Sequence, residues 1–457
     1  MRTAQGIPTA VLAAEDRGQK QAKDKPTTAR IHIQSFGPVR RAQLDVTDII
    51  VLNGLQSSGK STIAKLIYFF KSLPETLYQN LIIADDPTAD LKKKLVIACR
   101  NRLMDFFGTT KHMKGLFLKY TYAENKDITV QYENRSGHAR VKFSNALMAG
   151  LTEIAQRIKH YREHTEGDRP WDLSAMQFFR ADQMRFFHSV RREVKQLFVE
   201  PREMLYIPAG RSLVTTLSEE LKEVESFRFD PLMKEFVSRI NLLRRDFTKD
   251  LDEMIEDRKK LSAEPIDFDR LRAMKTLIEE ILQGRYRVEK GEERILLDDQ
   301  NYVKIRYSSS GQQESLWILH LLFLAVLEGQ AVFGVFEEPE AHLYPLTQYH
   351  LVKLIALYLG AEENQAIITT HSPYVMASLN TLLLAHQAAT KNRVSTVQVI
   401  KSHCWLDGAR VSAYFVEKGS IRDIYDRDSG IIDPQFIDHA SETINDDFDR
   451  LLDLVQA

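Results

Sequence analysis

GLQSSGKST, residues 54–62, is the stretch that decides which fold this sequence can adopt. It fits the pattern G-x-x-x-x-G-K-[ST] at every fixed position: Gly54, Gly59, Lys60 and Ser61. The apolar run at 49–52 directly before it is typical of a buried strand. The apolar residues after it recur at helical spacing, at Ile63, Leu66, Ile67 and Phe70. Strand, glycine-rich loop and helix in this order predict a phosphate-binding loop.

A phosphate-binding loop works mainly through its backbone. N–H groups of the loop and of the helix N-terminus point at the phosphate, and the helix dipole adds positive potential there. In such a loop Lys60 reaches the β- and γ-phosphates, and the Ser61 hydroxyl ligates Mg²⁺. We therefore expect Mg²⁺ and ATP, or another purine triphosphate, to be held by Gly54, Ser57, Ser58, Gly59, Lys60, Ser61 and Thr62.

Length, composition and charge restrict the possible domain organisation, compartment and partners. The chain has 457 residues, of which 44% are hydrophobic and 27% charged, so one large α/β domain with an insertion, or two lobes, is expected. The net charge of −1 does not require a nucleic-acid partner, so any DNA surface would be a local patch. Cys99 and Cys404 form no C-x-x-C motif, which argues against disulfides and structural zinc and for a reducing, cytoplasmic compartment. No apolar run is long enough to span a bilayer, and the N-terminus lacks a secretory signal, so no membrane partner is expected.

Four segments are expected along the chain. Residues 1–29 are mixed in composition and show no sustained apolar period, which is typical of a flexible tail. Residues 30–212 form an N-terminal lobe with the phosphate loop and a β meander. Residues 213–284 predict a helical insertion whose apolar spacing is too irregular for a long coiled coil, and residues 285–457 form a C-terminal lobe. The fold class is therefore α/β, with a mixed-sheet core, an antiparallel β subdomain and a helical insertion.

Three motifs of the C-terminal lobe place polar residues at the ends of apolar elements. SSSGQQE, residues 308–314, precedes an apolar helix and offers hydroxyl and N–H groups that could bind an anion. Taken alone, the motif is more typical of a serine helix cap. The apolar run VFGVFEE ends in two adjacent carboxylates, Glu337 and Glu338. One of them can hold the metal shell while the other activates water. The alternative interpretation is a strand that ends in a solvated acidic turn. Adjacent strand residues face opposite sides, so only special strand-end geometry brings both carboxylates into use. AIITTHSP ends in His371, and a lone histidine at a strand end is more often structural.

Taken together, the order of these parts resembles that of ABC-type ATPase heads of the SMC, RecF and OLD-like group over about residues 30–415. GLQSSGKST matches Walker A, and SSSGQQE resembles the signature motif, with Ser309, Ser310 and Gly311 in the Ser-Gly-Gly places. VFGVFEEPEAHLYP resembles the Walker B strand and following loop, and ITTHSPYVMASL resembles the switch-histidine motif. YIPAGRS, residues 206–212, resembles a Pro-Ala-x-Arg-Ser segment that OLD-like ATPases share.

The resemblance implies roles for these residues. Lys60, Ser61 and Thr62 would hold the phosphates and Mg²⁺, with Glu337 in the metal shell. Most heads carry Asp at that place, so the longer Glu337 side chain is compatible with a contact through water. Glu338 would activate the attacking water, and His371 would sense the γ-phosphate. The sequence has no clear glutamine-loop residue, so we expect Arg211 or Ser212 to contact the metal shell or the γ-phosphate instead.

The resemblance also implies assembly. Ser309, Ser310 and Gly311 would complete the ATP site of a neighbouring subunit. Because one chain carries one copy of each motif, at least a homodimer is expected.

The head resembles the stand-alone ATPase subunits of bacterial anti-phage systems of the PARIS (AriA) and Septu (PtuA) types, which work with a separate effector such as a TOPRIM or HNH nuclease. Only about eighty residues follow His371, which is short for a nuclease domain. The aspartates of this acidic tail are more typical of solvated side chains on a hairpin and a final amphipathic helix than of a nuclease site. The insertion and this tail are the expected partner-binding surfaces.

The alternatives are a RecF- or SMC-like DNA-repair or recombination ATPase and a nucleotide-dependent scaffold with little turnover. Two basic clusters keep DNA binding open: Arg185, Arg191, Arg192 and Lys195; and Arg239, Arg244, Arg245 and Lys249. Such clusters are more often solvated helix faces. Steep loss of DNA binding with added salt would favour the repair ATPase.

Overall fold

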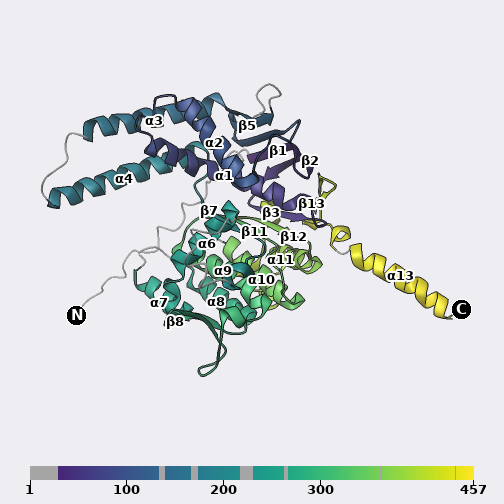
Figure 1. The fold of residues 1–457 in the computed structure, drawn as a ribbon. Coiled ribbons are helices and arrows are strands. Elements are labelled where there is room, and N and C mark those ends of the chain that lie inside the picture. The colour runs from purple at the N-terminus through teal and green to yellow at the C-terminus, as the bar shows by residue number, and fades with distance from the viewer. Residues whose placement is uncertain are drawn as a thin grey trace, which may run out of the picture.

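A computed structural model describes residues 29–132, 139–165, 173–216, 230–261, 266–360, 363–437 and 439–456 (Figure 1). The predicted flexible tail, 1–29, lies outside this part of the chain except for its last residue. Residues 217–229 and 262–265 of the predicted insertion also lie outside it. Within the described stretches, no helix combines the length and apolar character needed to cross a bilayer.

The fold is built on one mixed sheet of 11 strands. In spatial order these are β6 (Ala139–Phe143), β5 (Lys126–Tyr132), β4 (Phe117–Ala123), β1 (Ala29–Phe36), β2 (Val39–Val46), β14 (Ser420–Asp423), β13 (Val411–Glu417), β3 (Ile49–Asn53), β12 (Gln365–Thr370), β11 (Val332–Glu337) and β7 (Glu203–Ile207). The strands from β6 to β2 pair antiparallel, including the predicted meander, and those from β13 to β7 pair parallel. The predicted mixed α/β class is confirmed.

The parallel half of the sheet is buried on both faces, as parallel strands usually are. Ile49 and Val51 of β3 point into one hydrophobic core, and Ile50 and Leu52 point into a second core on the other face. Helix α1 (Lys60–Ile83) fills the second core. The first core holds α9 (Ser310–Glu328), α10 (Pro345–Leu359) and α11 (Pro373–Lys391). This alternation explains why the strand before the phosphate loop is a continuous apolar run.

The helices of the predicted insertion pack into the body of the protein. They are α5 (Ser212–Thr216), α6 (Pro231–Leu243), α7 (Leu251–Leu261) and α8 (Phe268–Leu282). Phe236, Leu271 and Ile278 belong to the same core as α9 and α10. Removing residues 213–282 would therefore open that core, so the deletion cannot isolate a partner-binding surface.

The remaining elements lie at the periphery. Helix α2 (Leu91–Phe107) lies against α1, and α3 (Asn145–Thr165) and α4 (Leu173–Leu197) project together from the upper part of the molecule (Figure 1). A small antiparallel sheet contains β8 (Arg285–Glu289), β9 (Glu292–Leu296) and β10 (Tyr302–Lys304). Strands β15 (Tyr425–Asp426) and β16 (Ile431–Ile432), helix α12 (Arg393–Val399) and helix α13 (His439–Gln456) complete the chain. Helix α13 extends away from the body (Figure 1).

Candidate active site

The predicted site residues gather at the carboxyl edge of the parallel strands. In register, Asn53 of β3 pairs with Thr370 of β12, and Thr369 pairs with Glu337 of β11. The three strands therefore end side by side, and their polar end residues meet at one edge, where ligands bind in open α/β sheets. This edge carries the phosphate loop, Glu337, Glu338 and His371, and the turn after β7 adds Arg211.

The phosphate loop has the backbone that its glycines permit. Gly54, Ser57 and Gly59 have φ angles of 141°, 58° and 112°. A Cβ on Gly54 would lie 2.3 Å from the carbonyl oxygen of Val416, so only glycine fits there. Helix α1 then begins at Lys60 without a side-chain cap. The N–H groups of its first turn are thus left for an anion rather than for a side chain of the chain itself.

Lys60 is buried against its own loop. Its Nζ donates to the carbonyl oxygens of Gly54, at 2.6 Å, and Leu55, at 2.8 Å. Burial lowers the pKa of Lys60, whereas the carboxylates of Glu338 and Glu340 raise it. The ammonium group therefore lies within electrostatic reach of the carboxylates that follow β11.

The two adjacent carboxylates take different environments. Glu337 is buried: its Oε2 accepts a hydrogen bond from the N–H of Ala209 at 3.3 Å, and its Oε1 has no partner within the part of the chain that the structure describes. Glu338 is half-buried and has a left-handed φ of 42°. Its N–H donates to the carbonyl of Thr369 at 3.0 Å, and its Oε1 lies 3.5 Å from Nδ1 of His371. A left-handed residue at the end of the strand departs from simple alternation, which both carboxylates need in order to serve one site.

Glu340 belongs to the same site, although no role was predicted for it. Its Oε1 accepts hydrogen bonds from the Thr370 hydroxyl and, at 3.4 Å, from the N–H of His371. Burial raises the pKa of Glu340, and the bond from Thr370 lowers it. Glu340 thus ties the loop after β11 to the switch histidine. The only sequence signal was its place in the run Glu-Glu-Pro-Glu.

The signature segment forms the exposed start of α9. Ser309 is the N-cap: its Oγ accepts from the N–H of Gln312 at 3.3 Å, and the Gln312 side chain accepts from the N–H of Ser309 at 3.0 Å. A Cβ on Gly311 would lie 2.9 Å from the carbonyl oxygen of His342, so this helix start packs closely on the loop after β11. Capping the helix therefore leaves Ser309 and Ser310 exposed to solvent.

The prediction that Arg211 contacts phosphate or the metal shell is wrong in this arrangement. Arg211 is 0% exposed, and all five of its N–H donors bind backbone carbonyls. No donor is left to bind a ligand. Ser212, which is half-buried at the start of α5, stays a prediction.

The donor set of this edge fits a magnesium triphosphate. Among the described residues, Ser58 Oγ and Glu337 Oε1 are buried and find no hydrogen-bond partner, as expected of oxygen atoms that a bound ligand or hydrated ion would satisfy. Hydroxyl and carboxylate oxygens suit Mg²⁺, which keeps water and phosphate oxygens in its shell. In the part of the chain that is described, no group of three or more His, Cys, Asp or Glu side chains could hold a metal.

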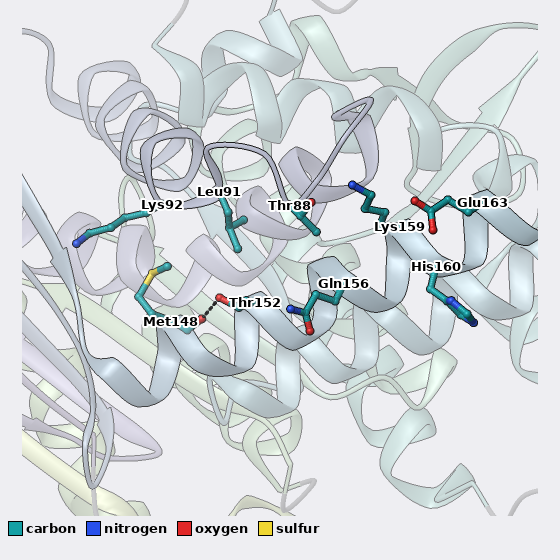
Figure 2. Close-up of a pocket in the computed structure, with 9 residues that line it drawn as sticks. All are labelled: Thr88, Leu91, Lys92, Met148, Thr152, Gln156, Lys159, His160 and Glu163. Carbon is teal, nitrogen blue, oxygen red and sulfur yellow. Dashed lines mark hydrogen bonds between the residues drawn. The ribbon is translucent and has the colours of Figure 1, made fainter.

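A surface pocket of about 520 Å³ lies elsewhere, between the start of α2 and α3 (Figure 2). Thr152, Gln156 and His160 face it from α3, and Thr88 and Leu91 lie across from them. Its lining includes no residue of the predicted motifs.

Comparison with known proteins agrees on ATPase chemistry. Residues 174–376 match the family model described as an AAA ATPase domain, a span that includes Glu337, Glu338 and His371. No curated protein sequence matches the chain significantly.

Similar solved structures include an SMC head bound to the C-winged helix domain of ScpA, with a TM-score of 0.40, 12% identity, and coverage of 87% of this chain and 97% of that one. The SMC head domain from Thermotoga maritima has a TM-score of 0.36, 11% identity, and coverage of 87% and 98%. The recombination mediator RecF has a TM-score of 0.33, 10% identity, and coverage of 87% and 99%. At these TM-scores the likenesses carry no argument about what this chain binds. The domain match and the phosphate loop together identify the chain as an ATPase.

Proposed function

We propose that this ATPase acts as a homodimer or larger assembly in which ATP lies between the phosphate loop of one copy and the signature segment of another. Six large apolar side chains around the candidate active site carry this proposal, each between 41% and 74% exposed. They are Leu55, Leu213, Tyr307, Tyr344, Leu346 and Tyr374. In the sequence, all six lie on loops or helix starts close to the phosphate loop, Arg211, the carboxylates, His371 or the signature segment. Clustered exposed apolar groups mark protein interaction sites.

Within the composite site, each group has a distinct task. Lys60 and the N–H groups of residues 54–62 bind the triphosphate, and the Ser61 hydroxyl and Glu337 would hold Mg²⁺, with Thr62 beside them. When bound, the ion neutralises charge that builds up on the transferred phosphoryl group. Glu338 accepts the proton of the attacking water, and His371, which lies next to Glu338, responds to the γ-phosphate. Ser309, Ser310 and Gly311 supply donors from the neighbouring copy.

The concentration dependence of turnover tests this assembly. Specific ATPase activity should rise with protein concentration and then level off over about a thousand-fold range, because active sites form by association. Leu346→Asp should move the midpoint to higher concentration. Val399→Asp is the matched control, since Val399 is exposed on α12 away from the strand ends. Constant specific activity at every concentration would contradict a composite site.

We further propose that the ATPase is the sensor or scaffold subunit of an anti-phage system and recruits its effector nuclease through α13. Ile444, Phe448, Leu451 and Val455 recur at helical spacing and are between 61% and 83% exposed. The helix carries five carboxylates and one arginine, a net charge of −4, and Asp446, Asp449 and Asp453 lie opposite this apolar stripe. Amphipathic helices of this kind bind in apolar grooves, and the charge favours a groove with a basic rim.

Co-purification with the product of the neighbouring gene, which the proposal expects to be a nuclease, tests the docking helix. Phe448→Asp should weaken the complex by at least about tenfold, because it places a charge in the apolar stripe. ATPase activity should be unchanged, since α13 projects from the body. Asp453→Asn, on the polar face, should leave the complex nearly intact. A complex that survives Phe448→Asp would exclude α13 as the docking element.

In both basic clusters, at least two of the four cations are engaged by carboxylates, which weakens the case for direct action on DNA. Arg191 pairs with Glu75 at 2.7 Å and with Glu203 at 2.9 Å, and Lys195 pairs with Glu203 at 2.7 Å. In the second basic cluster, Arg244 pairs with Glu293 and Lys249 with Asp257. These cations already have carboxylate partners within the protein, so they are poor candidates for phosphate contacts.

A further inference from the structure

Arg211 joins three segments that are far apart in sequence. Its Nε donates to the carbonyl of Glu314 in α9 at 2.7 Å. Nη1 donates to the carbonyls of Pro208 and Glu337 at 3.1 and 3.0 Å, and Nη2 donates to those of Glu338 and Pro339 at 3.1 and 3.0 Å. One side chain therefore binds the turn after β7, the carboxylate turn after β11 and the first part of α9.

The positive charge of the buried Arg211 is balanced by nearby carboxylates. Burial lowers the pKa of its guanidinium, whereas Glu314, Glu340, Glu337 and Glu338 raise it. The Glu314 carboxylate lies 3.6 Å from Nε. The planar guanidinium presents five donors in fixed directions, which the three donors of a lysine ammonium cannot reproduce. The position thus requires arginine rather than any cation.

Further contacts extend this link to the signature segment. The Thr215 hydroxyl, one helical turn after Arg211, lies 3.4 Å from the carbonyl of Gln313. The Gln313 side chain donates to the carbonyls of Ile305, Arg306 and Ser308, directly before the signature serines. Gly311 packs against the carbonyl of His342. The start of α9 and the turn that carries Glu338 are therefore connected through partly buried hydrogen bonds and close packing.

We propose that Arg211 is a positioning residue that makes the carboxylate turn and the start of α9 one rigid unit. When the signature segment binds the triphosphate of a neighbouring copy, the same unit sets the position of Glu338 in the chain's own site. The two sites of a dimer then hydrolyse ATP cooperatively, because each signature contact biases the geometry of the other site. This inference rests on the composite ATP site proposed above.

Steady-state kinetics of Arg211→Lys test the proposal. We expect kcat to fall by at least about tenfold and the Hill coefficient for ATP to move towards one. Binding of a fluorescent ATP analogue to the phosphate loop should change by less than about twofold, since Lys60 and its loop keep their contacts. A purely structural role would instead lower thermal stability and nucleotide binding together.

Arg410→Lys is the matched control. Arg410 also donates to backbone carbonyls, those of Leu359 and Asn364, and pairs with Asp48 at 2.9 Å. Asp48 and Asn364 precede β3 and β12, so this arginine lies at the opposite edge of the sheet. Its replacement should lower stability without changing the Hill coefficient. If Arg211→Lys and Arg410→Lys have the same kcat and Hill coefficient, the proposal is overturned.

Two further variants keep the result decisive. If Arg211→Lys does not fold, Thr215→Val removes the neighbouring link to Gln313 with little change in shape, and an unchanged Hill coefficient would overturn the proposal. Loss of turnover in Lys60→Ala together with normal cooperative turnover in Arg211→Lys would refute only this inference. Full turnover in Lys60→Ala would refute the composite site itself.

Discussion

Replacing Glu338 with glutamine is expected to lower kcat for ATP hydrolysis by about 100- to 1000-fold while ATP still binds. The amide keeps the shape of the side chain but cannot accept the proton of the attacking water. Glu338 lies beside His371 and acts electrostatically on Lys60, the residue that we expect to bind the β- and γ-phosphates. Because hydrolysis ends the ATP-bound state, the variant should also accumulate as an ATP-bound dimer.

Phosphate release measures the rate, and light scattering after size exclusion with ATP measures the assembly. Glu153→Gln is the control, because Glu153 is an exposed carboxylate on α3, which projects from the upper part of the molecule. It should leave both quantities unchanged. A Glu338→Gln protein that stays monomeric with ATP and hydrolyses it at the normal rate would refute the role of Glu338 and the composite site together.

Mixing two inactive variants is expected to restore activity. Lys60→Ala removes the cation of the phosphate loop, and Ser310→Glu puts a negative charge on the signature segment. Each variant alone should have at most about a hundredth of the wild-type activity, because each defect damages every site of a homodimer. In a mixed dimer, one site combines an intact phosphate loop with an intact signature segment. Random pairing should therefore restore about a quarter of the wild-type sites.

The matched control is a mixture of Lys60→Ala with Glu338→Gln. Both changes affect the same half of the composite site, so no combination of these chains contains an intact site, and activity should not return. If the mixture of Lys60→Ala with Ser310→Glu is no more active than the two variants measured separately and added together, Ser310 does not complete the site of another copy.

Much of the site's framework could be predicted because it depends on neighbours in sequence. The loop at 54–62, with its apolar strand before it and its apolar helix after it, forms β3, loop and α1 as expected. The runs that end in Glu338 and His371 form strands that end beside it. Strand burial on both faces leaves a continuous apolar run in the sequence, so these elements were readable.

Other features could not be predicted, because their cause lies far away in the chain. Helix α4 begins in a stretch for which no element was predicted, and it packs on α1 and α3. Arg211 looked like a phosphate ligand in the sequence, since nothing local shows that its donors bind carbonyls more than 100 residues away. Glu340 joined the site only through the neighbouring end of β12.

By itself, the sequence determined an ATPase built on a strand, a phosphate loop and a helix, because glycine positions and apolar periods act over a few residues. Only the tertiary structure decided which polar groups share the site and which are occupied elsewhere. The parallel register brings Glu337, Glu338, Glu340 and His371 to one edge, and the same packing places Arg211 behind them. The physical reason is that burial and hydrogen-bond partners are set by segments that meet only after the sheet has formed.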